Sequence, residues 1–279
     1  MNIFQAIILG IVQGLTEFIP VSSSAHLVLV PFFAGWEFPE QEAFVFNVLV
    51  QWGTLLAVIV YFWKDILKII LDFIAGILKG KPFEEPKSRV GWFLILATIP
   101  AGLSGLLLKK LVEMAFNSPF ATAIFLIVTA ILLLAAEYIG KRTRNMQNMD
   151  WKDALWIGCF QAISIFPGVS RSGSTMTGAL VRNFERAEAA RFSFLMSIPI
   201  MLAAGLLEIK DLLDMPSLAV TGALPVIIAG FIAAAVSGYF SIQWLLEFLK
   251  KRSLTWFSAY CFVVGAVTLF FWLYVYRGF

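Results

Sequence analysis

The chain has 279 residues, of which 60% are hydrophobic and 14% are charged, and its mean hydropathy is +0.85. This composition excludes an ordinary water-soluble globular protein. The net charge of +3 gives no indication of a nucleic-acid partner. The first residues lack the basic region and the cleavage site of a removable signal peptide, so we expect Met1 to belong to the mature fold.

Six stretches of the chain are long and apolar enough to be membrane-spanning helices. A membrane-spanning helix needs about 20 mostly apolar residues. The stretches that satisfy this requirement are residues 43–63, 92–108, 119–139, 190–208, 218–248 and 255–276. The predicted fold class is therefore an all-α polytopic membrane protein of about six transmembrane helices, in which residues 1–279 form one integral membrane domain.

Two further apolar segments, residues 3–34 and 153–181, contain residues that stop a helix. Pro20 interrupts the first segment and Pro167-Gly168 interrupts the second, because proline lacks a backbone donor and glycine relaxes the backbone. The resulting arms are too short to span a bilayer. We therefore predict two re-entrant helix-loop-helix pairs, surrounded by protein or by a wet cavity. Their arms are residues 3–19 and 23–34, then residues 153–166 and 172–181.

The two broken segments belong to an internal repeat with an offset of 148 residues. We place the first repeat at about residues 1–63 and the second at about 149–208. The matched positions include Gly10 with Gly158, Gln13 with Gln161, Phe18 with Phe166, Val21 with Val169, Ser22 with Ser170, Ser24 with Ser172 and Glu40 with Glu188.

Lysine and arginine are concentrated in loops 64–91, 140–152 and 249–254, whereas residues 1–41 contain none. Because short cytoplasmic loops carry the excess of positive charge, these three loops are predicted to be inside and the N-terminal segment outside. The second broken segment then enters from the cytoplasm and the first from the opposite face. This is an inverted-topology repeat, whose polar elements meet near the middle of the membrane.

The broken segments carry three ionisable residues, Glu17, His26 and Arg171, at predicted membrane depth. Each costs roughly 2.5–3.5 kcal/mol at the centre of a spanning helix, so a functional role is the default hypothesis. Gln13 and Glu17 lie four residues apart on one helix face and could together bind a divalent cation. An oxygen-rich pair suits Mg²⁺ or Ca²⁺, with substrate phosphate oxygens and water completing the coordination.

Hydroxyl groups surround these charges in both loops. In the first, Ser22, Ser23 and Ser24 precede His26, the one histidine of the chain, which could activate a hydroxyl nucleophile. In the second, Arg171 offers a bidentate fork for phosphate. Its neighbours Ser170, Ser172, Ser174 and Thr175 would donate further hydrogen bonds. Gly168 and Gly173 would let the backbone approach the phosphate closely. Serines that only join helices and a histidine that only packs are the plainer interpretations.

An acid, a base, hydroxyls and a guanidinium at one site favour phosphoryl transfer, since positioning and charge neutralisation supply most of that catalysis. The surrounding apolar helices indicate a substrate with a long apolar tail. Whether Ser23 attacks the phosphorus through a phosphoserine or His26 activates a water directly is open at this stage.

The motifs QGLTEFIPVSSSAH (residues 13–26) and PGVSRSGST (residues 167–175) resemble the two signatures of the undecaprenyl-diphosphatase family of the bacitracin-resistance type. The segments FNVLVQWGTLLAV (46–58) and ARFSFLMSIP (190–199) are also similar, so the likeness covers the whole chain. The resemblance implies a bacterial inner-membrane enzyme that dephosphorylates undecaprenyl diphosphate, recycles the lipid carrier for peptidoglycan synthesis and confers bacitracin resistance.

The resemblance also implies roles for single residues. It places the metal on Gln13 and Glu17, phosphate binding on Arg171, and the essential serine and histidine on Ser23 and His26. It further implies access from the periplasmic side. Two positions depart from the family pattern: Gln13 is the neutral variant of an acidic position, and Ala25 stands where glycine is frequent. The first departure leaves less charge to hold a metal, and the second could restrict the backbone before His26. Both bear on metal affinity.

Two other classes of function are compatible with the pattern. A secondary transporter or lipid flippase would use the inverted repeat for alternating access, with Glu17 and His26 as a proton relay. A non-catalytic scaffold would leave three buried ionisable residues without a purpose. We expect membrane lipids as neighbours and leave the oligomeric state open, a homodimer included. The two cysteines, Cys159 and Cys261, lie in apolar segments and are expected to be free, buried packing residues.

Overall fold

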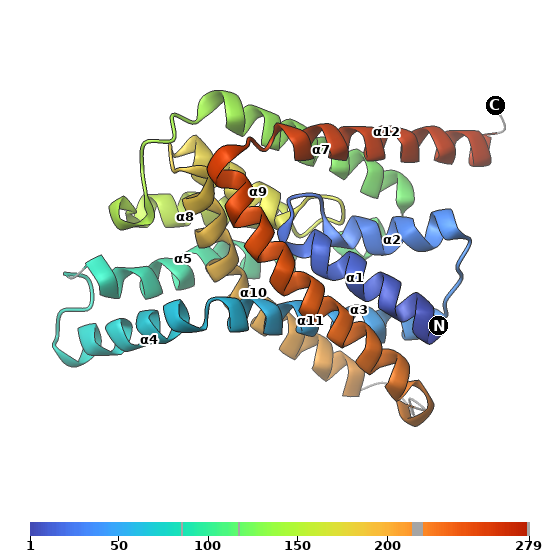
Figure 1. Ribbon diagram of the computed structural model, residues 1–279, viewed down its shortest axis with the longest axis horizontal. Coiled ribbons are helices and arrows are strands. Elements are labelled where there is room, and N and C mark those ends of the chain that lie inside the picture. Colours follow the sequence, from blue (N-terminus) through green and yellow to red (C-terminus); the bar gives the residue numbers. More distant parts are fainter. Residues whose placement is uncertain (85, 117, 214–219, 278–279) are drawn as a thin grey trace.

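The computed structural model describes residues 1–84, 86–116, 118–213 and 220–277. Within these ranges the regular structure is entirely helical, and the single β-bridge joins Arg144 to Phe184 outside any strand. The predicted all-α class is therefore confirmed. Figure 1 shows the helices packed into one bundle, with both chain ends at the same end of the long axis.

Six of the described helices are long and apolar enough to cross a membrane, and each corresponds to a predicted span. Most begin or end a few residues beyond the apolar stretch, because polar residues continue a helix once it leaves the hydrocarbon. The first two residues of the predicted span 218–248 lie outside the described residues. The helices are α3 (Glu40–Tyr61), α5 (Pro86–Leu107), α7 (Pro119–Ile139), α10 (Arg186–Leu213), α11 (Val220–Lys251) and α12 (Thr255–Arg277).

The two broken segments form helical hairpins whose arms have 11 to 16 residues, too few to span a bilayer. The first consists of α1 (Ile3–Phe18) and α2 (Ser23–Ala34), and the second of α8 (Trp151–Ile163) and α9 (Arg171–Val181). The predicted arm 153–166 begins two residues and ends three residues later than α8 does, since α8 is Trp151–Ile163.

Glycine is required in the turn of the second hairpin. Gly168 has a φ of +100°, and a Cβ placed there would lie 2.4 Å from the carbonyl oxygen of Thr122 on α7. Any other side chain would be strained by the backbone and would collide with that helix. The Pro167-Gly168 pair therefore lies in the interruption between α8 and α9, as the sequence predicted, and Gly168 lets the turn pack directly against α7.

The hairpins enter the bundle from opposite ends, and their turns meet near its middle (Figure 1). Helix α1 packs along α11, α8 packs along α5, and α9 lies between α7 and α10. The predicted meeting of the two polar elements is thus observed, while the repeat itself, residues 1–63 and 149–208, stays a prediction from the sequence.

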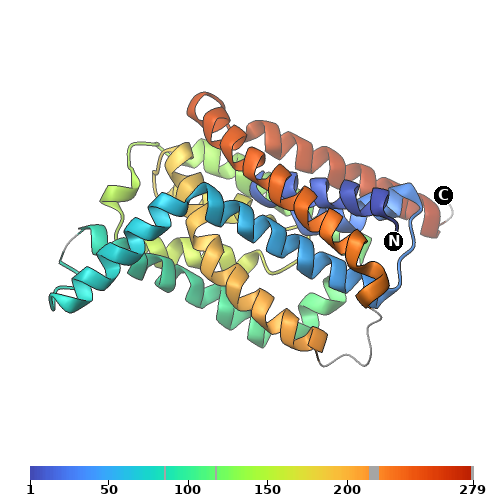
Figure 2. The same ribbon diagram turned by 60° about the horizontal axis from the view of Figure 1, so that its bottom comes forward.

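Two predictions about segments outside the spans were incomplete. Loop 64–91 contains α4 (Trp63–Leu78), and the helix α6 (Lys109–Phe116) follows α5, so both connections are partly helical. Loops 140–152 and 249–254 lie at the same end of the molecule as α4 (Figure 2).

Of the two cysteines, Cys261 is buried as expected, but Cys159 is exposed on α8, so its predicted packing role is wrong.

Buried ion pairs tie the helix ends together at that end of the bundle. Asp153 is fully buried and accepts from Arg144 and from Arg182, each at 2.6 Å. Burial favours the neutral acid, but the bonds from Arg144, the Asp150 backbone and Arg182 prevail and hold the pKa of Asp153 below its ordinary value. Sequence reasoning missed this residue, because an aspartate beside a basic loop looks like a surface charge.

Candidate active site

The turn of the first hairpin is built around Ser22. This residue has a φ of +70°, which is uncommon for a side chain other than glycine, and it caps α2 by accepting from the Ala25 N–H at 3.4 Å. Its hydroxyl also lies 3.1 Å from that of Ser24. A strained turn of this kind indicates a backbone held for a function.

The second turn repeats these contacts. Ser170 caps α9 by accepting from the Gly173 N–H at 3.0 Å, and its hydroxyl lies 3.2 Å from that of Ser172. Thr129 of α7 fastens the turn, because its hydroxyl donates to the Gly168 carbonyl at 2.9 Å and accepts from the Ser170 N–H at 3.0 Å. Thr129 was not predicted, since only the tertiary structure brings α7 to the turn.

Glu17 joins the two hairpins. Its Oε1 pairs with the Arg171 guanidinium, which comes from 154 residues further along the chain. Its Oε2 accepts from the Ser23 hydroxyl at 2.6 Å and from the Gln13 amide nitrogen at 2.9 Å. The carboxylate is 8% exposed and so is almost fully removed from solvent. Three of the predicted catalytic residues, Glu17, Ser23 and Arg171, are therefore brought into direct contact.

These residues open into a cavity of about 620 Å³. Its polar end contains Glu17, Arg171, and the hydroxyl residues Ser22, Ser23, Ser24 and Ser170, together with Gln51 and Gln161. An apolar arm continues between α5 and α10 toward α6. The arm is lined by Ala101, Gly102, Gly105, Leu106, Val112, Phe116, Ile200, Ala203, Ala204 and Leu207, with Lys109 and Glu208 beside it.

Four predicted substrate-binding residues do not line this cavity. Ser172 donates to the Ile19 carbonyl at 3.4 Å, and the Gly173 N–H caps its helix as described. The Thr175 hydroxyl bonds within the protein, to the Arg171 carbonyl at 2.8 Å and to the Ser193 hydroxyl at 2.5 Å, and Ser174 is fully buried. Ser174 and Thr175 lie one helical turn beyond Arg171 on α9, where the helix is covered by protein, as the bond of Thr175 to Ser193 of α10 shows.

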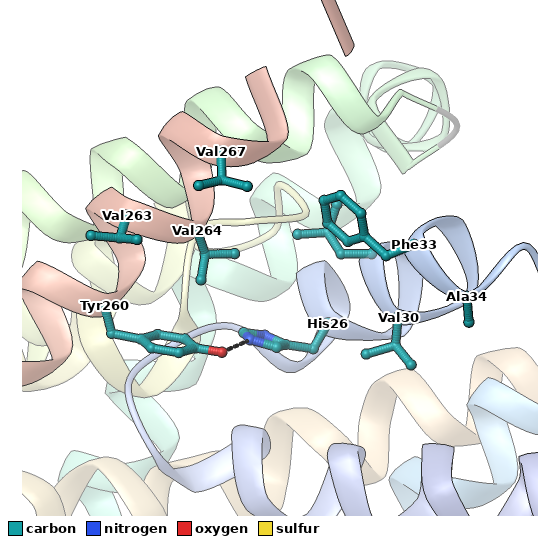
Figure 3. A pocket seen from close by; sticks show the side chains of 9 residues that line it. His26, Val30, Phe33, Ala34, Tyr260, Val263, Val264 and Val267 are labelled. Atoms are coloured by element: carbon teal, nitrogen blue, oxygen red, sulfur yellow. Dashed lines mark hydrogen bonds between the residues drawn. The ribbon is translucent and has the colours of Figure 1, made fainter. Parts of the chain in front are cut away.

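His26 also lies apart from the cavity. Its ring faces a separate groove of about 520 Å³ between α2 and α12, where it is bonded to Tyr260 at 2.8 Å (Figure 3). The predicted contact between His26 and the neighbouring serine hydroxyls is not among the hydrogen bonds of the described residues. Tyr260 was not predicted, because 234 residues separate it from His26.

The side chains around the cavity include few groups that could bind a metal ion. The described residues contain no cluster of three or more His, Cys, Asp or Glu side chains that could hold one. Gln13 is 2% exposed, directs its amide N–H at Glu17 and does not belong to the cavity lining. Glu17 alone therefore fits as a protein ligand, and a cation there would depend on the oxygens of a bound phosphate.

A model of the family described as "Bacitracin resistance protein BacA" matches residues 6–267. The chain is 43% identical to a protein from Chlorobium phaeobacteroides over 95% of both chains. It is 41% identical to one from Myxococcus xanthus, over 96% of this chain and 89% of the relative. It is 44% identical to one from Gloeobacter violaceus, over 96% of this chain and 91% of the relative. Each of these three relatives is named undecaprenyl-diphosphatase.

Proposed function

Since the chain belongs to the bacitracin resistance protein BacA family, we infer that it is a membrane undecaprenyl-diphosphatase. It hydrolyses undecaprenyl diphosphate to undecaprenyl phosphate and inorganic phosphate. This reaction returns the lipid carrier to peptidoglycan synthesis and removes the lipid diphosphate that bacitracin binds. The observation that carries the proposal is the contact of Ser23 and Arg171 with one buried carboxylate, Glu17, at the head of a cavity with an apolar arm.

The diphosphate binds first to Arg171. Its planar guanidinium suits two phosphate oxygens at once, whereas in the structure it is paired with Glu17. A diphosphate competes for the same guanidinium, and Glu17 then loses its compensating charge inside a site that excludes most water. Substrate binding thus frees the Glu17 carboxylate from Arg171, and it can then accept the proton of the nucleophile.

Ser23 is the group placed to give that proton. Its hydroxyl lies 2.6 Å from Glu17 Oε2, which is hydrogen-bond distance for proton transfer. Ser23 Oγ attacks the terminal phosphorus while its proton passes to Glu17. The bond between that phosphorus and the bridging oxygen breaks, and undecaprenyl phosphate leaves. Glu17 gives this proton to the leaving undecaprenyl phosphate and is again a carboxylate. Water then attacks the phosphoserine while Glu17 accepts a proton from that water. The same proton passes to Ser23 Oγ as its bond to phosphorus breaks and inorganic phosphate leaves.

This route differs from the one that the sequence suggests in the residue that accepts the proton of the nucleophile. Glu17, not His26, contacts the nucleophile, because the imidazole is turned into the other groove. Direct attack by water is the alternative, and it would need no phosphoserine. The transporter alternative would require Glu17 and His26 to form one relay, and their side chains line different cavities.

The prenyl chain lies in the apolar arm between α5 and α10. Small residues such as Gly102, Gly105 and Ala204 leave room along it, and Lys109 stands where a negatively charged headgroup would pass. We assign the site to the periplasmic side of a bacterial inner membrane, as the family resemblance implies. A homodimer is not required, since every residue in this account belongs to one chain.

A divalent cation, Mg²⁺ or Ca²⁺, belongs to the proposal as a partner of the substrate. Glu17 would hold it together with diphosphate oxygens, and Gln13 would fix Glu17 through its hydrogen bond. When bound, such an ion neutralises part of the diphosphate charge.

The test is phosphate release from a long-chain prenyl diphosphate by detergent-purified protein. Arg171→Ala and Ser23→Ala are each expected to reduce kcat about 100-fold or more, since each removes a group that acts in the transition state. Radiolabelled terminal phosphate should be trapped on wild-type protein by rapid acid quenching and should be absent from the Ser23 variant.

Glu247→Gln, at an exposed ion pair with Lys250, is the matched control and should leave release unchanged. Full activity of Ser23→Ala would replace the phosphoserine route by direct water attack. No release by folded wild-type protein that binds the substrate would contradict the phosphatase and favour lipid transport.

A further inference from the structure

The groove between α2 and α12 contains a polar pair in apolar surroundings. His26 and Tyr260 are the only titratable side chains among its lining residues, and Figure 3 shows the Tyr260 hydroxyl directed at the imidazole. The two rings lie nearly parallel, with an interplanar angle of 10°. The remaining lining residues are Leu29, Val30, Phe33, Ala34, Val263, Val264 and Val267.

The contacts of the ring fix its protonation. His26 Nδ1 lies 2.8 Å from the Ser22 carbonyl oxygen, which can only accept a hydrogen bond. Nδ1 therefore carries the proton, and in the neutral ring Nε2 is an acceptor. The Tyr260 hydroxyl donates to Nε2 at 2.8 Å. Both ring nitrogens are thus saturated, and neither is directed at Glu17 or Ser23.

The carbonyl that the ring holds belongs to the strained residue of the first turn. Ser22 has its φ at +70°, and its carbonyl accepts from the His26 N–H at 3.3 Å as well as from the imidazole. A residue other than glycine adopts a backbone in this region only where its surroundings hold it. The next residue is Ser23, whose hydroxyl contacts Glu17 at 2.6 Å.

We propose that Tyr260 and His26 are positioning residues, which hold the Ser22 peptide so that Ser23 faces the terminal phosphate. Tyr260 keeps the proton of the imidazole on Nδ1, Nδ1–H holds the Ser22 carbonyl, and the turn then presents the nucleophile. This inference rests on the proposed function for its effect on activity. The contact itself is a property of the folded protein and can be measured without substrate.

The chain has a single histidine, so protein labelled with ¹⁵N-histidine gives the signals of His26 alone. In wild type reconstituted in lipid, the protonated nitrogen should be Nδ1. In Tyr260→Phe the Nε2 acceptor loses its donor, and a substantial fraction of the proton should move to Nε2. A wild-type ring protonated on Nε2 would overturn the proposal, whatever the enzymatic activity.

Two substitutions of His26 separate positioning from base catalysis. The amide nitrogen of asparagine can occupy the place of Nδ1 and donate to Ser22, but an amide cannot act as a base. His26→Asn should therefore keep about a tenth of the wild-type kcat, while His26→Leu should lose about 100-fold. Equal losses in both variants, with both proteins folded by size exclusion in detergent, would contradict positioning.

Tyr260→Phe should lower kcat about 10-fold with KM unchanged, because the phosphate ligands stay in place while the nucleophile is less well aligned. Tyr274→Phe, at an exposed position of the same helix, is the control and should match wild type. A Tyr260→Phe enzyme with wild-type kcat would refute the role of the hydroxyl. A wild-type protein that releases no phosphate would instead count against the proposed function. The NMR result would still test the contact of His26 with Ser22, because it is measured without substrate.

Discussion

Glu17 is contacted by three different side chains, those of Gln13, Ser23 and Arg171, which donate to it or pair with it. Gln13 stabilises it from the preceding turn of α1 and adds no charge. In the structure the pair is a donor and an acceptor. The sequence spacing predicted that the two side chains share one helix face, but the direction of the hydrogen bond between them depends on where the Arg171 and Ser23 side chains lie.

Gln13→Glu tests the metal at this position. A second carboxylate beside Glu17 would repel it unless a cation lies between them, so divalent ions should bind more tightly. We expect the concentration of Mg²⁺ or Ca²⁺ that gives half-maximal phosphate release to fall about 10-fold. Gln51→Glu, which adds a carboxylate elsewhere in the cavity, is the comparison.

The measurement is phosphate release after EDTA treatment and stepwise return of the ion. Wild-type activity that persists in EDTA would remove the cation from the proposal. An unchanged half-maximal concentration in Gln13→Glu would instead separate position 13 from the ion.

At the scale of single elements, the helix ends are fastened by carboxylates that bridge several segments. Asp153 joins α8 to Arg144 in the preceding loop and to Arg182 at the end of α9. Glu137 similarly accepts from Arg186 at 2.6 Å and from the Leu254 N–H at 2.7 Å. These bonds hold the outer ends of the second hairpin and of α10, so that the inner turns meet in a fixed register.

Asp153→Ala should lower the free energy of unfolding by about 3 kcal/mol, because two buried arginine contacts lose their partner. The measurement is the denaturation midpoint in detergent. The exposed pair of Glu247 and Lys250 is the control, and Glu247→Gln should change stability by less than about 0.5 kcal/mol. A similar small change for Asp153→Ala would show that the pair does not fasten the hairpin.

The pH dependence follows from the same residue. Its folded-state pKa lies below the ordinary value, so its contribution to stability is complete at neutral pH. The contribution is lost as the pH falls from the ordinary aspartate range through the folded pKa. Wild type and Asp153→Ala should therefore differ in stability at pH 7 and converge in acid.

Across the whole molecule, one end of the cavity suits the diphosphate headgroup of the substrate and the other end suits its prenyl chain. The charged end lies where the two hairpins meet, and the apolar arm is a space between α5 and α10. A Cβ added at Gly102 or Gly105 would meet no other atom within 4 Å, so both glycines border open space. Because these glycines have no side chain, the arm is wide enough there for a branched hydrocarbon.

Gly105→Trp should fill part of this arm. KM for a long-chain prenyl diphosphate should rise about 10-fold, since lost apolar contact of about 1.4 kcal/mol corresponds to that factor. Hydrolysis of a short, water-soluble prenyl diphosphate should change little. Leu103→Trp adds the same bulk at an exposed position of α5 and should affect neither substrate. Equal effects on the long and short substrates would show that the prenyl chain binds outside this arm of the cavity.

The features that depend on neighbouring residues can be predicted from the sequence. Continuous apolar stretches specify the six spans, because a helix must satisfy its own backbone in lipid. Pro20 and Gly168 interrupt the two re-entrant segments for local backbone reasons, and Glu17, Ser23 and Arg171 are conspicuous because charge and hydroxyls are costly at that depth.

Which of these groups bond to one another depends on the tertiary structure. Glu17 meets Arg171 across 154 residues and His26 meets Tyr260 across 234, and no local pattern specifies such partners. The same packing turns the His26 ring into the groove beside α12, although it stands three residues from Ser23 in the chain. Side-chain direction depends on which helix packs against which face, and that is a property of the assembled bundle.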